Sequence, residues 1–238
     1  MTRSVLDQWD HQLYELTKTA AVAVTFTDVR PTELPHEVTP QPSGCSFWKL
    51  AAEGRAFYTE APDHLGCLVG AYALGAELSK RQTTELAELT STMVKLSYVK
   101  AQEVAELPHL SDRLRYVIYT PLSQSPSFPD LILVRGNVWH LMLLTEAARA
   151  AGFLKSTPAM GRPACAIIPE SLASNEAVLS LGCIGNRVYT DLGDHEGYCA
   201  IPGKAIESVC ASLSTILEAN KILGQFHRER QDRLIATA

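Results

Sequence analysis

The sequence predicts an α/β (or α+β) protein, with one compact domain around a mixed sheet. Helical patterns alternate along the chain with short β-rich runs, and neither kind dominates. The chain of 238 residues is long for one domain and short for two, so we expect residues 1–238 to fold as one. Hydrophobic residues make up 46% and charged residues 20%, which is ordinary for a globular protein.

The first half of the chain indicates three helices, two strands and a proline-rich loop. We expect helices over 4–18, 47–53 and 79–100, and strands over 21–27 and 56–59. Four prolines make residues 30–44 an extended loop that leads to Cys45. The pair Ser79 and Gln82 forms a capping box for the longest helix. The apolar stripe of that helix is expected to face the core: Leu86, Leu89, Met93 and Leu96.

The second half is richer in strand signals. Strands are expected over 115–122, 131–134, 164–168, 178–181, 188–190 and 198–201. A helix over 138–151 has Asn137 as its N-cap and ends at Gly152. A loop with proline and glycine leads to Cys165. The C-terminal helix, over 204–230, carries one apolar stripe of Val209, Leu213, Ile216 and Leu223.

Composition and charge exclude several classes of protein. A net charge of −5 argues against binding to nucleic acid through phosphate contacts. The chain has no run of about 18 apolar residues, so we expect no membrane span. Acidic residues among the first twenty and the lack of an apolar segment there argue against a secretory signal. We therefore expect a cytoplasmic protein whose cysteines are not paired in disulfides.

Four of the six cysteines follow a weak internal repeat. Cys45 and Cys165 each follow a loop rich in proline and glycine, and each is followed by a Leu-Gly-Cys sequence that contains Cys67 or Cys183. A glycine comes two or three residues after each second cysteine. This pattern suggests two pseudo-symmetric halves, over 20–105 and 110–203, whose four cysteines could meet between them.

Such cysteines suit an iron–sulfur cluster. Cysteine thiolates ligate these clusters, and free backbone N–H groups next to glycines can hydrogen-bond to the sulfides. Zinc sites with four cysteines usually contain paired C-x₂-C motifs, and this chain has none. The spacing therefore favours a [4Fe–4S] cluster over zinc, with Cys45, Cys67, Cys165 and Cys183 as ligands. The alternative is that these cysteines are buried small residues or separate thiols.

Five segments around these cysteines resemble the domain-of-unknown-function family number 169, also called the uncharacterised ArCR family. They are GCSFWKLAAEGRAFYT, DHLGCLVGAYALG, GRPACAIIP, SLGCIGNRVYTDL and EGYCAIPG, and the resemblance runs from about Ala21 to Gly203. It implies a cytosolic prokaryotic protein, often from anaerobic or metal-rich metabolism, and no particular reaction. It also implies that Cys45, Cys67, Cys165 and Cys183 occupy the family's signature positions.

Other residues near the motifs have two interpretations each. Gly66 and Gly182 precede cysteines and are expected to approach a cofactor with their backbone. Arg187 could neutralise a cluster or an anion, or could pair with Asp191, Asp194 or Glu196. His64 could ligate a metal or activate Cys67, or could be a surface histidine in a turn. Aromatic side chains could wall a pocket or lie in the core, namely Trp48 and Tyr189.

The remaining cysteines are expected to be packing residues. Cys199 lies in a predicted strand, and Cys210 lies on the last helix beside Val209. The leading hypothesis is therefore a cytosolic iron–sulfur protein with a redox, sensing or substrate-binding role. One alternative is a thiol enzyme or sulfur carrier that uses Cys67 or Cys183. Another is a module that binds a small anion without catalysis. A redox partner protein and a homo-oligomer are both possible partners.

Overall fold

The computed structural model describes residues 3–111, 114–154, 159–160 and 163–236. Within them one seven-stranded sheet has the order β2-β3-β1-β4-β7-β6-β5. The strands are β1 (Val22–Thr27), β2 (Phe57–Glu60), β3 (Tyr116–Pro121), β4 (Leu131–Asn137), β5 (Ala159–Met160), β6 (Val178–Ser180) and β7 (Glu196–Pro202). Neighbouring strands are antiparallel except for the parallel pair β5 and β6. The predicted mixed α/β class is confirmed.

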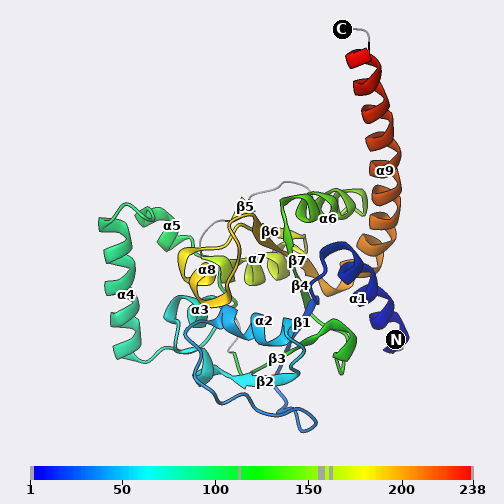
Figure 1. The fold of residues 1–238 in the computed structure, drawn as a ribbon. Helices are drawn as coiled ribbons and strands as arrows, with labels where there is room; N and C mark the ends of the chain where they lie inside the picture. Colours follow the sequence, from blue (N-terminus) through cyan, green and yellow to red (C-terminus); the bar gives the residue numbers. More distant parts are fainter. Residues whose placement is uncertain (1–2, 112–113, 155–158, 161–162, 237–238) are drawn as a thin grey trace.

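Helices cover both faces of this sheet (Figure 1). The α-helices are α1 (Arg3–Thr17), α2 (Gly44–Ala52), α3 (Leu68–Ala73), α4 (Lys80–Lys95), α5 (Ala101–Ala105), α6 (Val138–Ala150), α7 (Ile167–Ser174), α8 (Ile184–Thr190) and α9 (Ile206–Ala236). Short 3₁₀ turns are η1 (Ala61–His64), η2 (Leu122–Gln124), η3 (Ala164–Ala166) and η4 (Gly203–Ala205). The predicted caps are confirmed, because Ser79 and Gln82 bond each other's backbone N–H groups and Asn137 accepts from the His140 N–H.

The sheet separates two hydrophobic cores. Alternate residues of the central strands point to opposite faces, as Leu133 and Val134 of β4 do. One core, which we call the α2 core, contains residues of α2, α3, η3 and α7. The other, the α9 core, contains residues of α1, α6 and α9. The two cores divide the cysteines, because Cys45 and Cys165 lie in the α2 core with Cys183 packed against it, and Cys199 and Cys210 lie in the α9 core.

Two helical segments stand away from this body. The arm, as we call residues 80–107, contains α4 and α5 and extends from the α3 side of the molecule (Figure 1). No residue of α4 is buried, and Leu89 and Leu96 are 41% and 74% exposed. The expectation that this helix faces the core is therefore wrong. The far end of α9 projects beyond α6, and its exposed apolar residues include Ile222, Leu223 and Phe226.

Two predicted strands are helical in the structure. Residues 164–168 form η3 and the start of α7, and residues 188–190 belong to α8. Both segments are short and contain β-branched residues, so their local preference favours strand. In α7 the proline at position 169 falls in the first helical turn, where its missing N–H costs nothing. Helix α2 begins earlier than expected, so Cys45 lies in a helix rather than at the end of a loop.

The strand order is partly alike when it is read outward from β1 and from β4, apart from the additional strand β5. On one side of the central pair the order is β1, β3, β2, and on the other it is β4, β7, β6. Along the chain Cys45 comes after β1 and Cys67 after the edge strand β2, whereas Cys183 comes after β6. The two sides differ in that α6 and β5 come between β4 and Cys165, and β5 lies beyond β6 at the sheet edge. By this correspondence β3 belongs with the first series, although it falls within the expected second half over 110–203. A relation between two halves stays a prediction.

Among the described residues, no helix is long and apolar enough to cross a membrane.

Candidate functional site: four cysteines at one cavity

Each of the four motif cysteines lies where a helix begins. Cys45 is the second residue of α2, and Cys67 and Cys183 are the N-caps of α3 and α8. Cys165 lies in η3, which continues into α7. The first N–H groups of a helix have no partner within the helix, so they are free to bond a ligand or a side chain. The Asn186 N–H uses this freedom and donates to the Cys183 Sγ at 3.4 Å.

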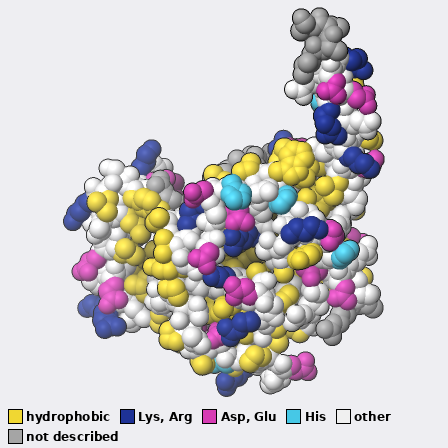
Figure 2. All heavy atoms as spheres, viewed as in Figure 1, with side chains coloured by type: hydrophobic (Ala, Val, Ile, Leu, Met, Phe, Trp, Pro, Cys, Tyr) yellow, Lys and Arg dark blue, Asp and Glu magenta, His cyan; other side chains and the backbone are white. Residues whose placement is uncertain are grey.

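These helix starts bring the four cysteines to one cavity of about 540 Å³. Cys45 and Cys165 are almost fully buried, and Cys67 and Cys183 are half-buried. The cavity lies between the body and the arm, and Figure 2 shows hydrophobic side chains on the facing sides of these two parts. The sequence segments that supply the cysteines are distant from one another, and the fold brings them together.

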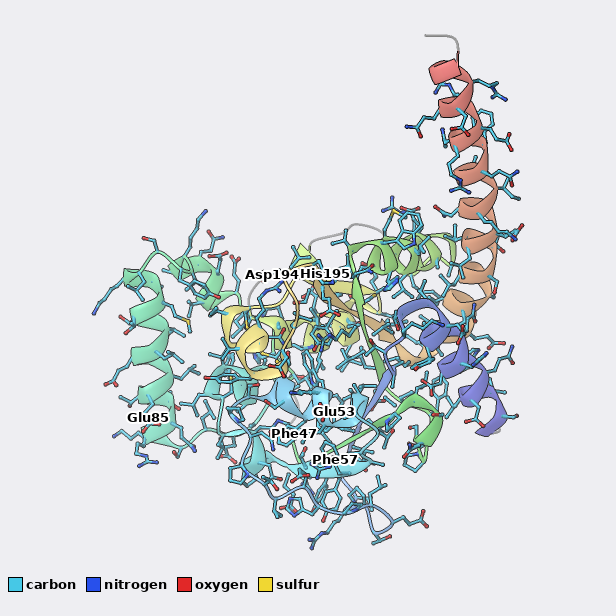
Figure 3. All side chains as sticks on the ribbon, viewed as in Figure 1. Phe47, Glu53, Phe57, Glu85, Asp194 and His195 are labelled. Atoms are coloured by element: carbon cyan, nitrogen blue, oxygen red, sulfur yellow. The ribbon has the colours of Figure 1, made fainter. Side chains whose placement is uncertain are left out.

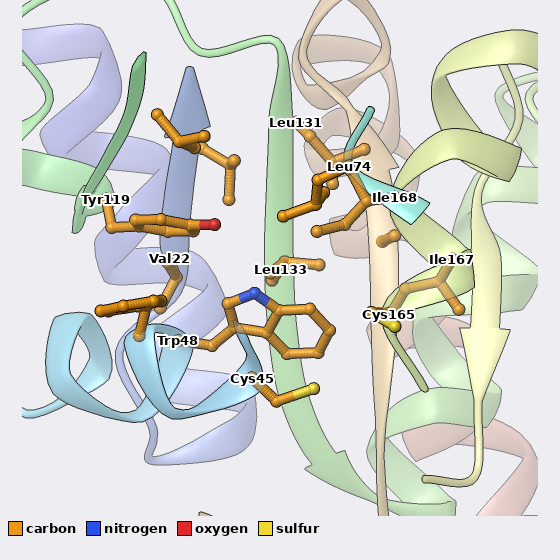
Figure 4. Packing of buried hydrophobic residues seen from close by; sticks show 14 of the residues in the cluster. Val22, Cys45, Trp48, Leu74, Tyr119, Leu131, Leu133, Cys165, Ile167 and Ile168 are labelled. Atoms are coloured by element: carbon orange, nitrogen blue, oxygen red, sulfur yellow. The ribbon is translucent and has the colours of Figure 1, made fainter. Parts of the chain in front are cut away.

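Two of the sulfur atoms lie next to one glycine. A Cβ atom placed on Gly70 would lie 3.5 Å from the Cys67 Sγ and 3.9 Å from the Cys165 Sγ. Figure 4 shows Cys45 and Cys165 on the same side of Trp48, with α2 and the start of α7 supplying one each. The glycine thus lets the backbone of α3 pass close to both thiols.

Burial keeps the free thiols protonated. It raises the pKa of Cys165 well above its usual value, and the nearby cysteines raise it further. Burial also raises the pKa of Cys45 strongly, with Cys183 and Cys67 adding to the effect. Burial raises the pKa of Cys67 too, but the backbone N–H groups of Gly70, Val69 and Gly44 act against it. The cysteines therefore lie near one another in a site that gives them hydrogen-bond donors, and its described lining includes no lysine or arginine.

Buried polar groups beside the cysteines lack hydrogen-bond partners among the described residues. The side chain of Asn186 is 1% exposed, and neither its Nδ2 nor its Oδ1 has a partner. Its amide nevertheless acts to lower the pKa of Cys45, so it lies close to that thiol. The Trp48 Nε1 and the Tyr119 hydroxyl likewise have no hydrogen bond of good geometry. Burial raises the pKa of Tyr119, nearby Cys45 and Cys165 raise it further, and the neighbouring Trp48 indole acts against the rise. Unpaired buried donors are rare and call for an explanation such as a missing acceptor.

The four cysteines do not form a site for a single metal ion in the part of the chain that the structure describes. Within the described part of the chain, no group of three or more His, Cys, Asp or Glu residues could hold one ion. Tetrahedral zinc, with Zn–S bonds of about 2.3 Å, would need sulfur atoms about 3.8 Å apart. A four-iron cluster binds each thiolate at a different iron atom, so it accepts sulfur atoms that lie farther apart than those of a zinc site. Ligation of a [4Fe–4S] cluster by these four cysteines stays a prediction.

His64 lies in the core and not on the surface. It is 1% exposed, its Nε2 bonds the Thr59 hydroxyl at 2.8 Å, and its ring packs 5.0 Å from that of Phe47. Burial lowers the His64 pKa to about 4, and the charge of Asp63 opposes this shift. The expected surface histidine is therefore wrong. A neutral imidazole that is bonded to Thr59 is also a poor choice for activating Cys67.

The guanidinium of Arg187 bonds main-chain oxygens. It makes four hydrogen bonds to the carbonyls of residues 181, 192, 193 and 196, with the shortest to Leu181 at 2.5 Å. Of the expected partners, Glu196 pairs with Arg135 at 2.5 Å and Asp191 pairs with Lys49 at 2.5 Å. Asp194 lies in the turn before β7 (Figure 3). Arg187 thus holds the segment around α8 together, and its role toward a cofactor stays a prediction.

The two glycines that were expected to approach a cofactor, Gly66 and Gly182, lie in different surroundings. Gly66 lines the cavity, and a Cβ there would lie 2.2 Å from the Gln41 carbonyl oxygen. Gly182 has φ +77°, and a Cβ there would lie 2.7 Å from a methyl group of Leu192. Gly182 therefore shapes the turn before Cys183 through its backbone conformation. Tyr189 lines the cavity and is 44% exposed, and Trp48 is a core residue that contacts Tyr198 edge-on at 5.3 Å.

Sequence reasoning noted the glycine that follows Cys67, which is Gly70, but missed Asn186. Gly70 stands three residues after Cys67, and Asn186 stands three residues after Cys183, so both fall in the first turn of a helix that begins at a cysteine. The backbone N–H and the side chain of a residue three positions after an N-cap can both reach the side chain of the capping residue, which here is a cysteine. That spacing was the available signal.

Comparison with known proteins identifies the family without giving an activity. A distant relative is an uncharacterised protein of Methanocaldococcus jannaschii, 24% identical over 178 residues, which cover 71% of this chain and 75% of the relative. No solved structure matches the chain significantly. The family model described as uncharacterised ArCR matches residues 13–212, a range that contains all four cavity cysteines and the whole sheet. The chain therefore belongs to the domain-of-unknown-function family 169.

Proposed function

We propose that this protein binds one [4Fe–4S] cluster through Cys45, Cys67, Cys165 and Cys183, and that it has a redox, sensing or substrate-binding role in the cytoplasm. The observation that carries the proposal is the meeting of these four cysteines at one cavity, although they come from distant parts of the sequence. The two other cysteines lie across the sheet in the α9 core.

The charges around the site support this proposal. Cys45, Cys67 and Cys165 have raised pKa values, so as free thiols they are mostly neutral at pH 7. Iron supplies the positive charge that makes bound thiols ionise, as metal ions generally do for cysteine ligands. The chain itself supplies N–H donors toward the sulfur atoms, from α3 at Cys67 and from α8 at Cys183.

The unpaired donors support it as well. The Asn186 amide, the Trp48 indole N–H and the Tyr119 hydroxyl lie beside Cys45 or Cys165, and each lacks an acceptor in the described residues. Hydrogen bonds to cluster sulfurs tune the reduction potential. A bound cluster would supply one-electron transfer, and these donors would help to set its potential. A redox partner protein would then deliver or remove the electron.

The two alternative functions have less support. A nucleophilic cysteine needs a low pKa, and cavity thiols whose pKa is raised do not meet that need. An anion-binding module needs cationic groups, and the described residues that line the cavity include neither lysine nor arginine. Arg187, the expected cation, is engaged with carbonyl oxygens.

The test is to purify the full chain without oxygen and measure its iron, its acid-labile sulfide and its optical spectrum. We expect about four iron and about four sulfide per chain. Cys67→Ser and Cys165→Ser should lower the iron content by at least fourfold. Cys199→Ser and Cys210→Ser are matched controls, because these residues are buried in the α9 core and should leave the iron content unchanged.

Two outcomes would overturn the proposal. One is a colourless protein that takes up no iron or sulfide, even after anaerobic reconstitution. The other is equal iron loss in the α9-core variants and the cavity variants, since this would indicate a general effect of cysteine replacement. Circular dichroism of each variant shows whether it is folded, and only folded variants are compared.

A further inference from the structure

The cavity is larger than a cluster requires. A core of four iron and four sulfide atoms, at about 30 Å³ for each atom, the volume that a water molecule takes in the liquid, fills about 240 Å³. The cavity measures about 540 Å³, so roughly half of it lies beyond the cluster. Cavities of this total size are typical of sites for small molecules.

The arm forms the far wall of this remaining space. Leu89 and Met93 of α4 and Val104 of α5 line it, opposite Val69 and Ile184 of the body. Figure 3 marks the two sides with Glu85 on α4 and Phe47 on α2. The Tyr98 hydroxyl accepts a hydrogen bond from the Ile184 N–H at 3.4 Å, which ties the arm to the start of α8. An apolar wall that none of the described segments covers, tied to the helix start that carries Cys183, is an arrangement for a ligand.

The charges at the cavity select against anions. Its described lining contains two carboxylates, Glu85 and Glu103, and no lysine or arginine. Both carboxylates already have partners near the arm surface, since Glu85 pairs with Arg81 and Glu103 accepts the Lys100 N–H. They therefore do not supply a buried anchor for a cation. Most of the remaining lining is aliphatic or aromatic, which favours an uncharged ligand.

We propose that a small, uncharged and largely apolar molecule of about 10 to 15 non-hydrogen atoms binds between the arm and the four cysteines. That size follows from the free half of the cavity at about 20 to 30 Å³ per atom. The ligand's place next to a cluster rests on the proposed function, whereas the cavity and its apolar wall do not. The arm residues Leu89 and Met93 would contact the ligand directly.

The test uses two probes of the same shape and different charge. 1-Naphthalenemethanol is uncharged and 1-naphthoate is anionic, and the binding of each is followed by its fluorescence and by calorimetry. We expect the alcohol to bind at least tenfold more tightly than the carboxylate. Leu89→Glu and Met93→Glu should each weaken binding of the alcohol by at least tenfold. Leu96→Glu is the matched control, because Leu96 is 74% exposed at the end of α4 and should not change binding.

The measurements are made on the full chain with its iron content known, and again on the Cys67→Ser variant. Binding of the alcohol with the expected variant pattern supports the inference, whether or not iron is present. A protein that contains iron and sulfide but binds neither probe overturns this inference and leaves the proposed function standing. Equal weakening by Leu96→Glu also overturns it, as does tighter binding of the carboxylate than of the alcohol.

Discussion

Replacement of Gly66 tests how the cavity is held together. Gly66 lies between η1 and Cys67, and its neighbour in space is the backbone of the proline-rich loop at Gln41. An added Cβ would lie 2.2 Å from the Gln41 carbonyl oxygen and 3.4 Å from its carbon. The φ angle of Gly66 is not in the left-handed region, so Gly66→Ala has no cost from backbone conformation. Its whole effect is the steric contact.

The size of this effect follows from the contact distance. An ordinary contact of a Cβ starts near 3.4 Å, so two backbone segments must separate by about 1 Å. Overpacking of this kind costs about 1 to 3 kcal/mol, and backbone on both sides places Gly66→Ala near the upper end. For a chain of this size each kcal/mol lowers the melting temperature by about 2 to 4 °C. We therefore expect a decrease of about 6 to 12 °C.

The assay is thermal unfolding by circular dichroism, together with urea titration. The control is Gly185→Ala, which adds the same methyl group to the same cavity, 3.6 Å from a carbon of the Tyr189 ring. Because Gly185 lies within α8, alanine there should be neutral or should stabilise by up to about 1 kcal/mol. Equal melting temperatures for Gly66→Ala and the wild type would refute the reasoning, since they would mean that the loop yields without cost.

Four further predictions concern the site and the fold around it. Gly70→Ala should melt at or slightly above the wild-type temperature, because alanine favours a helix. It should nevertheless hold less than half of the wild-type iron, since the added methyl group would contact the sulfur atoms of both Cys67 and Cys165; wild-type iron content would contradict this. Because the His64 pKa is about 4 in the folded protein, unfolding takes up a proton at this residue below pH 6.5. The free energy of unfolding should therefore fall by about 3 kcal/mol between about pH 6.5 and 4. In urea titrations across that range His64→Gln should lack this pH-dependent loss of stability. Removal of the chain after Asn220 should change the melting temperature by less than about 2 °C, because the described residues beyond it are almost all exposed; a larger, concentration-dependent change would indicate contact with a second copy. Burial raises the pKa of Cys199 and Cys210 to about 12, so alkylation of both in the native protein at pH 8 should be at least a hundredfold slower than in urea, as mass spectrometry can measure.

The elements that the sequence predicts well are those with a strong local signal. The N-cap at Asn137 and the capping box at Ser79 mark helix starts by chemistry that acts within one turn. The central strands are buried on both faces and read as nearly continuous apolar runs. The strand predictions for residues 164–168 and 188–190 were wrong, because a short β-branched run suits a strand as well as a buried helical turn. Only tertiary packing decides between the two.

The arm shows a second limit. Leu86, Leu89 and Met93 have the spacing of a helix that packs on a core, and the spacing does not tell what the stripe faces. In the structure Leu89 and Met93 border a cavity, so a periodic pattern that is typical of a core also fits a cavity wall. For the cysteines, the repeated Leu-Gly-Cys pattern predicted that four of them could meet, and all four line one cavity. Asn186 was missed because its importance depends on burial beside Cys45, which no local pattern expresses.

The position of the cysteines links the proposed cluster to the folding of the chain. Cys45 and Cys67 precede β3, whereas Cys165 and Cys183 follow β4, so the site forms only when the central strands are paired. The unfolded chain has no preformed set of ligands, and the binding energy of a group held by all four cysteines therefore adds to the stability of the native sheet. Without that group the structure contains neutral thiols, unpaired donors at Asn186 and Trp48, and an open cavity under the arm, each of which weakens this face of the sheet. The stabilising effect of a bound cluster is expected to act mainly on α2, α3, α8 and the arm, because these elements carry or border the four cysteines.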